Sequence, residues 1–102
     1  MVSDPLDLSS ELNKLSVDLK RLEAEYNTFF AGRLSRPPWE TRRRVEAGLK
    51  RWAHRRIERS VDRFRFEMLQ SRFASFAELW DRRQRTREEG RDEGREKGRE
   101  EG

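Results

Sequence analysis

Seven apolar residues alternate at spacings of four and three through the first third of the chain. They are Leu8, Leu12, Leu15, Leu19, Leu22, Tyr26 and Phe29. This spacing is the a/d pattern of a helix that packs against a partner along its whole length. Asp4 is suited to cap the N-terminus of this helix, and Pro5 is suited to its first helical position. Gly32 is suited to the position just after its last turn. We therefore predict a helix over about residues 5–31.

A second helix is expected after the Pro37-Pro38 step, because a residue before proline avoids the helical conformation and Pro38 can open a helix. Its apolar positions are again spaced by four and three: Val45, Leu49 and Trp52. The phase of the pattern is lost before Ile57. We predict a helix over about residues 38–53 and a break between about His54 and Glu58. One long helix with a phase shift is the alternative.

Two apolar stripes lie on the third predicted helix, which covers about residues 57–89. One stripe consists of Phe66, Leu69, Phe73, Phe76 and Trp80, and the other of Ile57, Val61, Phe64 and Met68. A helix with two such stripes is buried on two sides. We expect the first stripe to form an antiparallel, coiled-coil-like seam with the first helix. The second stripe can face the second helix of the same chain, and it is also the candidate face for a second copy of the chain or for another partner.

These elements predict an all-α fold, either a three-helix bundle or an antiparallel coiled-coil-like hairpin whose groove is partly covered by the second helix. All hydrophobic residues lie within residues 1–80, so we place the domain there. Residues 81–102 are charged and carry a glycine at every fourth position from Gly90 to Gly102. Each glycine costs a helix about 1 kcal/mol relative to alanine. We predict a disordered tail, with helix continuing to about residue 89.

Residues suited to chemistry are sparse. The chain has no cysteine, and its one histidine, His54, has arginines as neighbours. No phosphate-binding glycine loop follows a strand, and no stretch approaches the roughly 20 apolar residues that cross a membrane. No signal peptide is recognisable. We expect a non-enzymatic, cytoplasmic protein without cofactor, metal, membrane or small-molecule ligand.

Basic charge is concentrated in the middle of the chain. Residues 1–30 hold three basic and six acidic groups, whereas residues 31–59 hold ten basic and three acidic groups. The candidate face for an anionic partner consists of Arg42, Arg43, Arg44, Lys50, Arg51 and Arg55. This face can pair with the acidic first helix, within the chain or across an oligomer. It can also bind a protein partner or nucleic-acid phosphates.

Arg65 and Arg72 lie between the aromatic positions of the third helix. Their charged ends must reach solvent or a carboxylate. Glu23 and Glu25 are the expected partners if the first and third helices pack together.

Three segments carry a resemblance to a known group. They are EYNTFFAGRLSRPPWETRRRVE at residues 25–46, DRFRFEMLQSRF at 62–73 and LWDRR at 79–83. Together they resemble short, uncharacterised bacterial helical proteins, which implies a helical fold; no activity is carried over from this group. Separately, the GxxxG spacing of the tail is similar to that of the helical regulator of the bacterial flagellar export ATPase.

The sequence favours association over catalysis. We expect a self-associating helical adaptor or scaffold component, with a homodimer through the third helix preferred and an unidentified protein as a further partner. A small basic nucleic-acid-binding protein is the first alternative. The second is a structural tether that uses its GxxxG tail.

Overall fold

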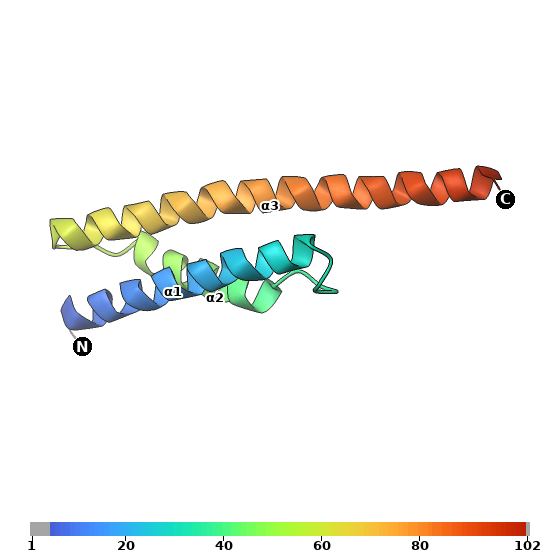
Figure 1. Cartoon of the computed structure of the whole chain (residues 1–102). Helices are drawn as coiled ribbons and strands as arrows, with labels where there is room; N and C mark the ends of the chain where they lie inside the picture. Colours follow the sequence, from blue (N-terminus) through green and yellow to red (C-terminus); the bar gives the residue numbers. More distant parts are fainter. Residues whose placement is uncertain (1–4, 102) are drawn as a thin grey trace.

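The computed structural model describes the backbone of residues 5–101 and the side chains of residues 8–90. It contains three helices, α1 (Pro5–Phe30), α2 (Trp39–Ala53) and α3 (Ser60–Glu101) (Figure 1). No strand occurs in this part of the chain. The all-α, three-helix prediction is confirmed. The predicted break between the second and third helices is present at residues 54–59.

The end of α1 follows from the glycine at position 32. Gly32 has a φ of 82°, a conformation that glycine adopts without steric strain. Its N–H donates to the Phe29 carbonyl, and the Arg33 N–H donates to the Thr28 carbonyl, both at 3.0 Å. This pair of hydrogen bonds is the Schellman motif, which satisfies the last carbonyls of a helix. The chain then passes the two prolines and starts α2 at Trp39.

α1 and α3 run in the same direction, so the predicted antiparallel seam between them is wrong. Their contacts advance together along both helices, from Asn13 with Arg65 at 2.7 Å to Tyr26 with Trp80, whose ring centroids are 4.1 Å apart. The reason is topological. Each of the two connections reverses the chain, so the third helix regains the direction of the first (Figure 1). α1 and α2 form the antiparallel hairpin instead.

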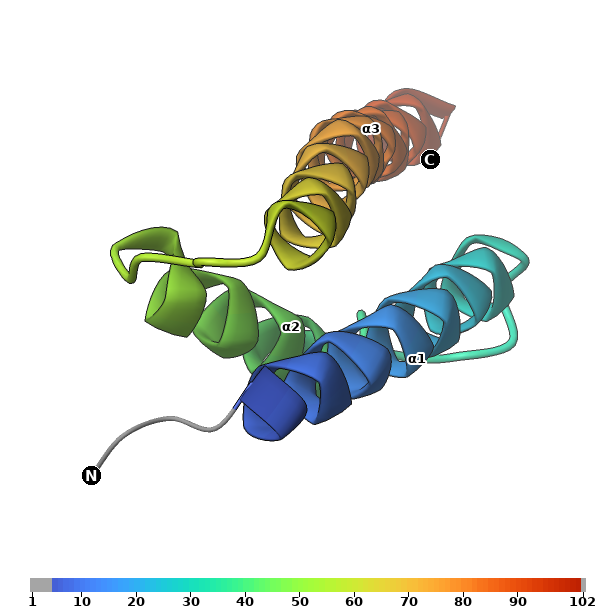
Figure 2. The ribbon, with the colours of Figure 1, turned by 90° about the vertical axis from the view of Figure 1, so that its left-hand side faces the viewer.

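α1 packs against both other helices, whereas α2 and α3 scarcely touch each other (Figure 2). The ladder residues of α1 are its a and d positions. The g flank of α1 faces α2, where Trp52 Nε1 donates to the Glu11 carboxylate. The e flank faces α3, where Arg72 Nη2 donates to Glu23 at 3.0 Å. One narrow apolar stripe therefore serves two partner helices.

The twelve residues of the predicted seam all join one apolar cluster. The seven ladder residues of α1 are buried, as are Phe66 and Trp80, and Leu69, Phe73 and Phe76 are partly buried. Val45, Leu49 and Trp52 of α2 also belong to the cluster, as do Phe30 and Ile57. Burial of a large apolar side chain stabilises a fold by roughly 1.5–3 kcal/mol. This cluster is therefore the main source of stability.

Ile57 departs from the prediction that placed it on an outward-facing stripe. α3 begins at Ser60 rather than at residue 57, so Ile57 lies in the connection and not on the helix. Its side chain is 9% exposed and belongs to the core cluster. The connection turns Ile57 inward, and the predicted partner face loses this residue.

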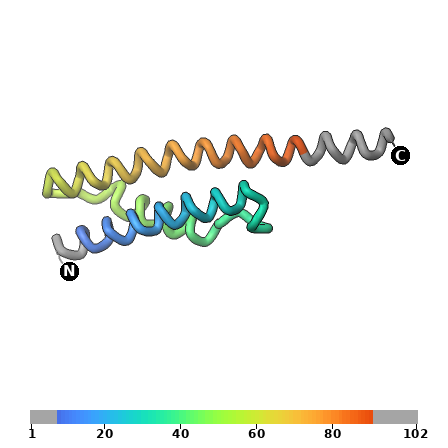
Figure 3. Tube along the Cα trace, viewed as in Figure 1, coloured from blue at the N-terminus to red at the C-terminus, as the bar shows by residue number. Residues whose placement is uncertain are grey.

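The contacts of α3 continue past Trp80, along the helix traced in Figure 3. Arg83 Cζ lies 4.3 Å from the ring centroid of Phe30, and Arg87 Cζ lies 4.6 Å from that of Phe29. Arg87 Nη1 also donates to the Phe29 carbonyl oxygen at 3.1 Å, near the C-terminus of α1. α3 does not end near residue 89 as predicted but continues to Glu101. The side chains of residues 91–102 lie outside the described part of the chain, and the predicted disorder of this tail stays a prediction.

Gly48 lets α1 and α2 approach closely. A Cβ atom at this position would collide with Leu15 Cδ2 and lie 3.2 Å from Leu15 Cγ. We expect Gly48→Val to lower the free energy of unfolding by about 1–3 kcal/mol, as overpacking does in other cores. Gly90→Ala is the matched control, because no atom lies within 4 Å of a Cβ there, and it should be neutral or stabilising. Urea unfolding followed by circular dichroism measures both, and an undiminished stability of Gly48→Val would contradict the close approach.

Candidate functional site

Arg42 of α2 joins all three helices. Its guanidinium makes a bidentate ion pair with Asp81 of α3, with 2.9 Å from Nη1 to Oδ1 and 3.1 Å from Nη2 to Oδ2. Nη1 also donates to the Tyr26 hydroxyl of α1 at 2.8 Å, and Nε donates to Glu46 at 3.1 Å. The side chain is 12% exposed. Arg42, predicted for the face of an anionic partner, therefore serves inside the protein.

The phenol of Tyr26 is fully buried and stacks on Trp80 at an interplanar angle of 13°. Burial raises the pKa of this phenol above its ordinary value of 10.0, against the lowering effect of Arg42. For Arg42, burial alone would lower the pKa, but the hydrogen bonds to Asp81 and Tyr26 outweigh it and raise the pKa. Tyr26 therefore stays neutral and Arg42 stays charged at neutral pH. Their contact is structural rather than an acid–base pair.

The other residues of the predicted basic face divide into two groups. Arg51 donates to Glu11 of α1 at 3.2 Å, so it pairs with the acidic first helix as one of our interpretations expected. Arg43, Arg44 and Lys50 are exposed on α2, and within the described residues none of them forms an ion pair. These three residues are the basic face that remains available to a partner.

Arg55 lies beyond the end of α2, in the connection to α3. Its Cζ is 5.1 Å from the ring centroid of Trp52. Together with Arg56 and Arg63 it lines a basic hollow at the α2–α3 connection. Arg55 is thus separate from the exposed face of α2, because the helix ends before reaching it.

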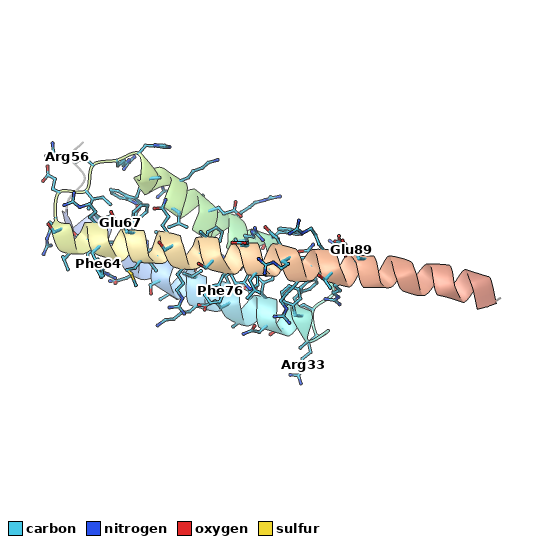
Figure 4. The ribbon with its side chains drawn as sticks, turned by 90° about the horizontal axis from the view of Figure 1, so that it is seen from above. Arg33, Arg56, Phe64, Glu67, Phe76 and Glu89 are labelled. Carbon is cyan, nitrogen blue, oxygen red and sulfur yellow. The ribbon has the colours of Figure 1, made fainter. Side chains whose placement is uncertain are left out.

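A groove of about 520 Å³ lies between α2 and α3, and α1 contributes no residue to its lining. We call it the α2–α3 groove. Leu49 and Phe73 provide its large apolar side chains, from α2 and α3 respectively. Arg43 and Lys50 lie at its α2 edge. Figure 4 looks down on α3, with α2 along one side of it and α1 along the other.

The outer stripe of α3 consists of Val61, Phe64 and Met68. These side chains are 58%, 62% and 57% exposed, although all three are apolar. Spacings of three and four place them on one side of the helix, near its N-terminal end (Figure 4). The stripe is therefore an apolar surface that no described part of the chain covers.

The described part of the chain offers few groups that could bind a metal ion. No three His, Cys, Asp or Glu side chains of the described residues come close enough to hold a metal ion. His54 is exposed at the C-terminal end of α2. Across the helices that could be searched, none is both long enough and apolar enough to cross a membrane.

Comparison with known proteins gives no further guidance: no family model, curated protein or solved structure matches this chain.

Sequence reasoning found some of these contacts and missed others. The predicted pairing of Arg72 with Glu23 is present, whereas Arg65 donates to Asn13 instead of a carboxylate. The α2–α3 groove was not predicted, because its lining mixes alanines with charged and large apolar residues and so forms no periodic pattern in the sequence. The role of Asp81 was also missed. The available sequence signal was the position of this acidic residue directly after Trp80, in a chain whose second helix is basic.

Arg42 and Asp81 should be energetically coupled. We expect Arg42→Ala and Asp81→Ala each to lower the free energy of unfolding by about 1–3 kcal/mol, because each leaves charged or buried partners unpaired. The double variant should cost less than the sum of the two, by at least about 0.5 kcal/mol.

Arg82→Ala is the control for this cycle. Arg82 pairs with Glu78 at 3.0 Å, but both side chains are well exposed, so the change should lie within about 0.5 kcal/mol. Chemical unfolding measures all four variants. Strict additivity of Arg42→Ala and Asp81→Ala would show that the ion pair does not connect the helices energetically.

Proposed function

We propose that this chain is a non-enzymatic helical adaptor that associates with a second copy of itself through the outer stripe of α3. The observation that carries the proposal is the exposure of Val61, Phe64 and Met68, three large apolar side chains on one face of α3. Apolar patches of this kind on small proteins commonly mark interaction surfaces. A cytoplasmic location is part of the same proposal.

The charges beside the outer stripe favour a second copy as the partner. Glu67 lies on one flank of the stripe. Arg65 and Arg72 lie on the other, where they also contact Asn13 and Glu23 of α1. Two copies with parallel α3 helices would place the acidic flank of one beside the basic flank of the other. A two-fold axis parallel to the helices would form each such contact twice, once on each side of the dimer interface.

A nucleic-acid-binding function is the second candidate. The observation in its favour is the group of exposed cations on α2, namely Arg43, Arg44 and Lys50, none of which is paired within the described residues. They lie within about two helical turns and could contact successive phosphates. The tether interpretation depends on the tail, most of which lies outside the residues described in full.

The self-association proposal predicts a particle of twice 12.3 kDa at micromolar concentration. Light scattering after size-exclusion chromatography should detect it, and Phe64→Ser/Met68→Glu should convert it to a monomer with unchanged helicity. Val17→Glu is the matched control, since Val17 is also exposed and apolar but lies on α1. A wild-type protein that remains at 12.3 kDa up to 100-fold higher concentration would rule the proposal out.

The nucleic-acid candidate predicts a mobility shift of mixed-sequence DNA or RNA that weakens as salt rises. Arg43→Glu/Arg44→Glu/Lys50→Glu should abolish the shift while leaving the circular dichroism spectrum intact. Arg33→Glu/Arg36→Glu serves as the control for lost positive charge, because these residues lie in the α1–α2 connection. An equal loss of the mobility shift in both variants would show that the shift is a non-specific charge effect.

A further inference from the structure

The α2–α3 groove is a consequence of how the three helices are arranged. α2 and α3 each pack on α1 but scarcely on each other, so they occupy positions like two diagonal corners of a four-helix bundle. α1 fills one of the remaining corners. Figure 2 shows the three helices nearly end on, with no described helix at the fourth corner. The groove lies on this side, between α2 and α3.

The lining of the groove suits a helix as occupant. Leu49 and Phe73 supply apolar surface at its base, whereas Ala47, Ala53 and Ala74 supply walls with small side chains. Small walls beside large apolar residues leave space for the side chains of an approaching helix. The stretch of α2 along the groove covers residues 43–53, which is about 15 Å or three helical turns.

The unpaired charge at the groove is positive. Glu46, the acidic residue of the lining, is already bound by Arg42 at 3.1 Å. Arg43 and Lys50 form no ion pair within the described residues, and on α3 the neighbouring residue of the lining is the neutral Gln70. Arg43 and Lys50 are seven residues apart, so they lie on the same side of α2, about 10 Å apart along its axis.

α1 already shows the kind of helix that packs beside α2. Its g positions carry Glu11, Asp18 and Glu25, which are spaced by seven residues. Glu11 binds Arg51 and Trp52, and Glu25 accepts a hydrogen bond from Thr41 at 2.6 Å. Acidic residues at heptad spacing beside an apolar stripe thus match the surface of α2 chemically.

We propose that the α2–α3 groove binds an amphipathic helix of a partner protein, with acidic residues seven positions apart beside its apolar stripe. A second copy of this chain fits less well, because the outer stripe has a single acidic neighbour, Glu67, whereas Arg43 and Lys50 match two acidic residues spaced by seven. The groove is a different surface from the outer stripe, so this proposal goes beyond self-association and does not rest on it.

A displayed library of amphipathic helices tests the proposal. Each member is an 18-residue helix (about five turns) with apolar residues at a and d positions and an equal chance of glutamate or lysine at every flanking position. Selection uses the full-length chain as the target. We expect enrichment of peptides with glutamates seven positions apart. Failure to enrich any binder, or enrichment of lysine at those positions, overturns the proposal.

Variants of the chain then locate the bound peptide. Ala74→Glu places a carboxylate in the groove, and Ser75→Glu places the same charge on the neighbouring, exposed residue outside it. We expect at least a tenfold loss of affinity for Ala74→Glu and less than a twofold change for Ser75→Glu. Equal effects of the two variants overturn the assignment to the groove.

Charge reversal checks the chemistry of the partner. Arg43→Glu/Lys50→Glu should weaken the selected peptide at least tenfold, and a copy of the peptide with lysine in place of the two glutamates should regain binding to this variant. Phe64→Ser/Met68→Glu should bind the original peptide normally. Loss of peptide binding in that last variant would instead place the peptide on the outer stripe. The mass of the same variant in light scattering tests self-association separately.

Discussion

A single apolar stripe on α1 has to cover two helices, and most of the architecture follows from this constraint. The a and d residues from Leu8 to Phe29 point between α2 and α3, while the g flank faces α2 and the e flank faces α3. Each partner can therefore take only one side of the stripe. α2 and α3 are held apart by the side chains that join them to α1, and the open groove between them results from the same packing that stabilises the core.

Arg42 limits how far the two outer helices can separate. Its side chain extends from α2 and donates hydrogen bonds to both the buried phenol of Tyr26 and the carboxylate of Asp81. Such a bidentate pair fixes direction as well as distance, which a lysine at this position could not do. The ion pair of Arg42 with Asp81 joins α2 to α3 next to Arg43, at one end of the groove, and the connection at residues 54–59 joins them beyond Ala53, at the other end.

The sequence pattern predicted those features that depend on periodicity or on local backbone chemistry. The ladder, the glycine that ends α1 and the break after Trp52 all belong to this class. The direction of α3 relative to α1 was predicted wrongly, because an apolar stripe looks the same when read in either direction. Ile57 was misplaced for a related reason: an apolar residue in a connection can extend a helical pattern by chance. The groove could not be read from periodicity, since it depends on which helix pairs stay apart.

The parallel arrangement of α1 and α3 also bears on how the chain assembles. Contacts between these helices join residues separated by 49 to 58 positions, so closing such a loop from an open chain is entropically costly. Once α2 lies antiparallel on α1, it returns the chain to the N-terminal half of α1, where α3 starts. The segment left to close is then the short connection at residues 54–59. α2 thus acts as a return path that brings the start of α3 beside α1, and the α1–α2 hairpin is the natural first unit to form.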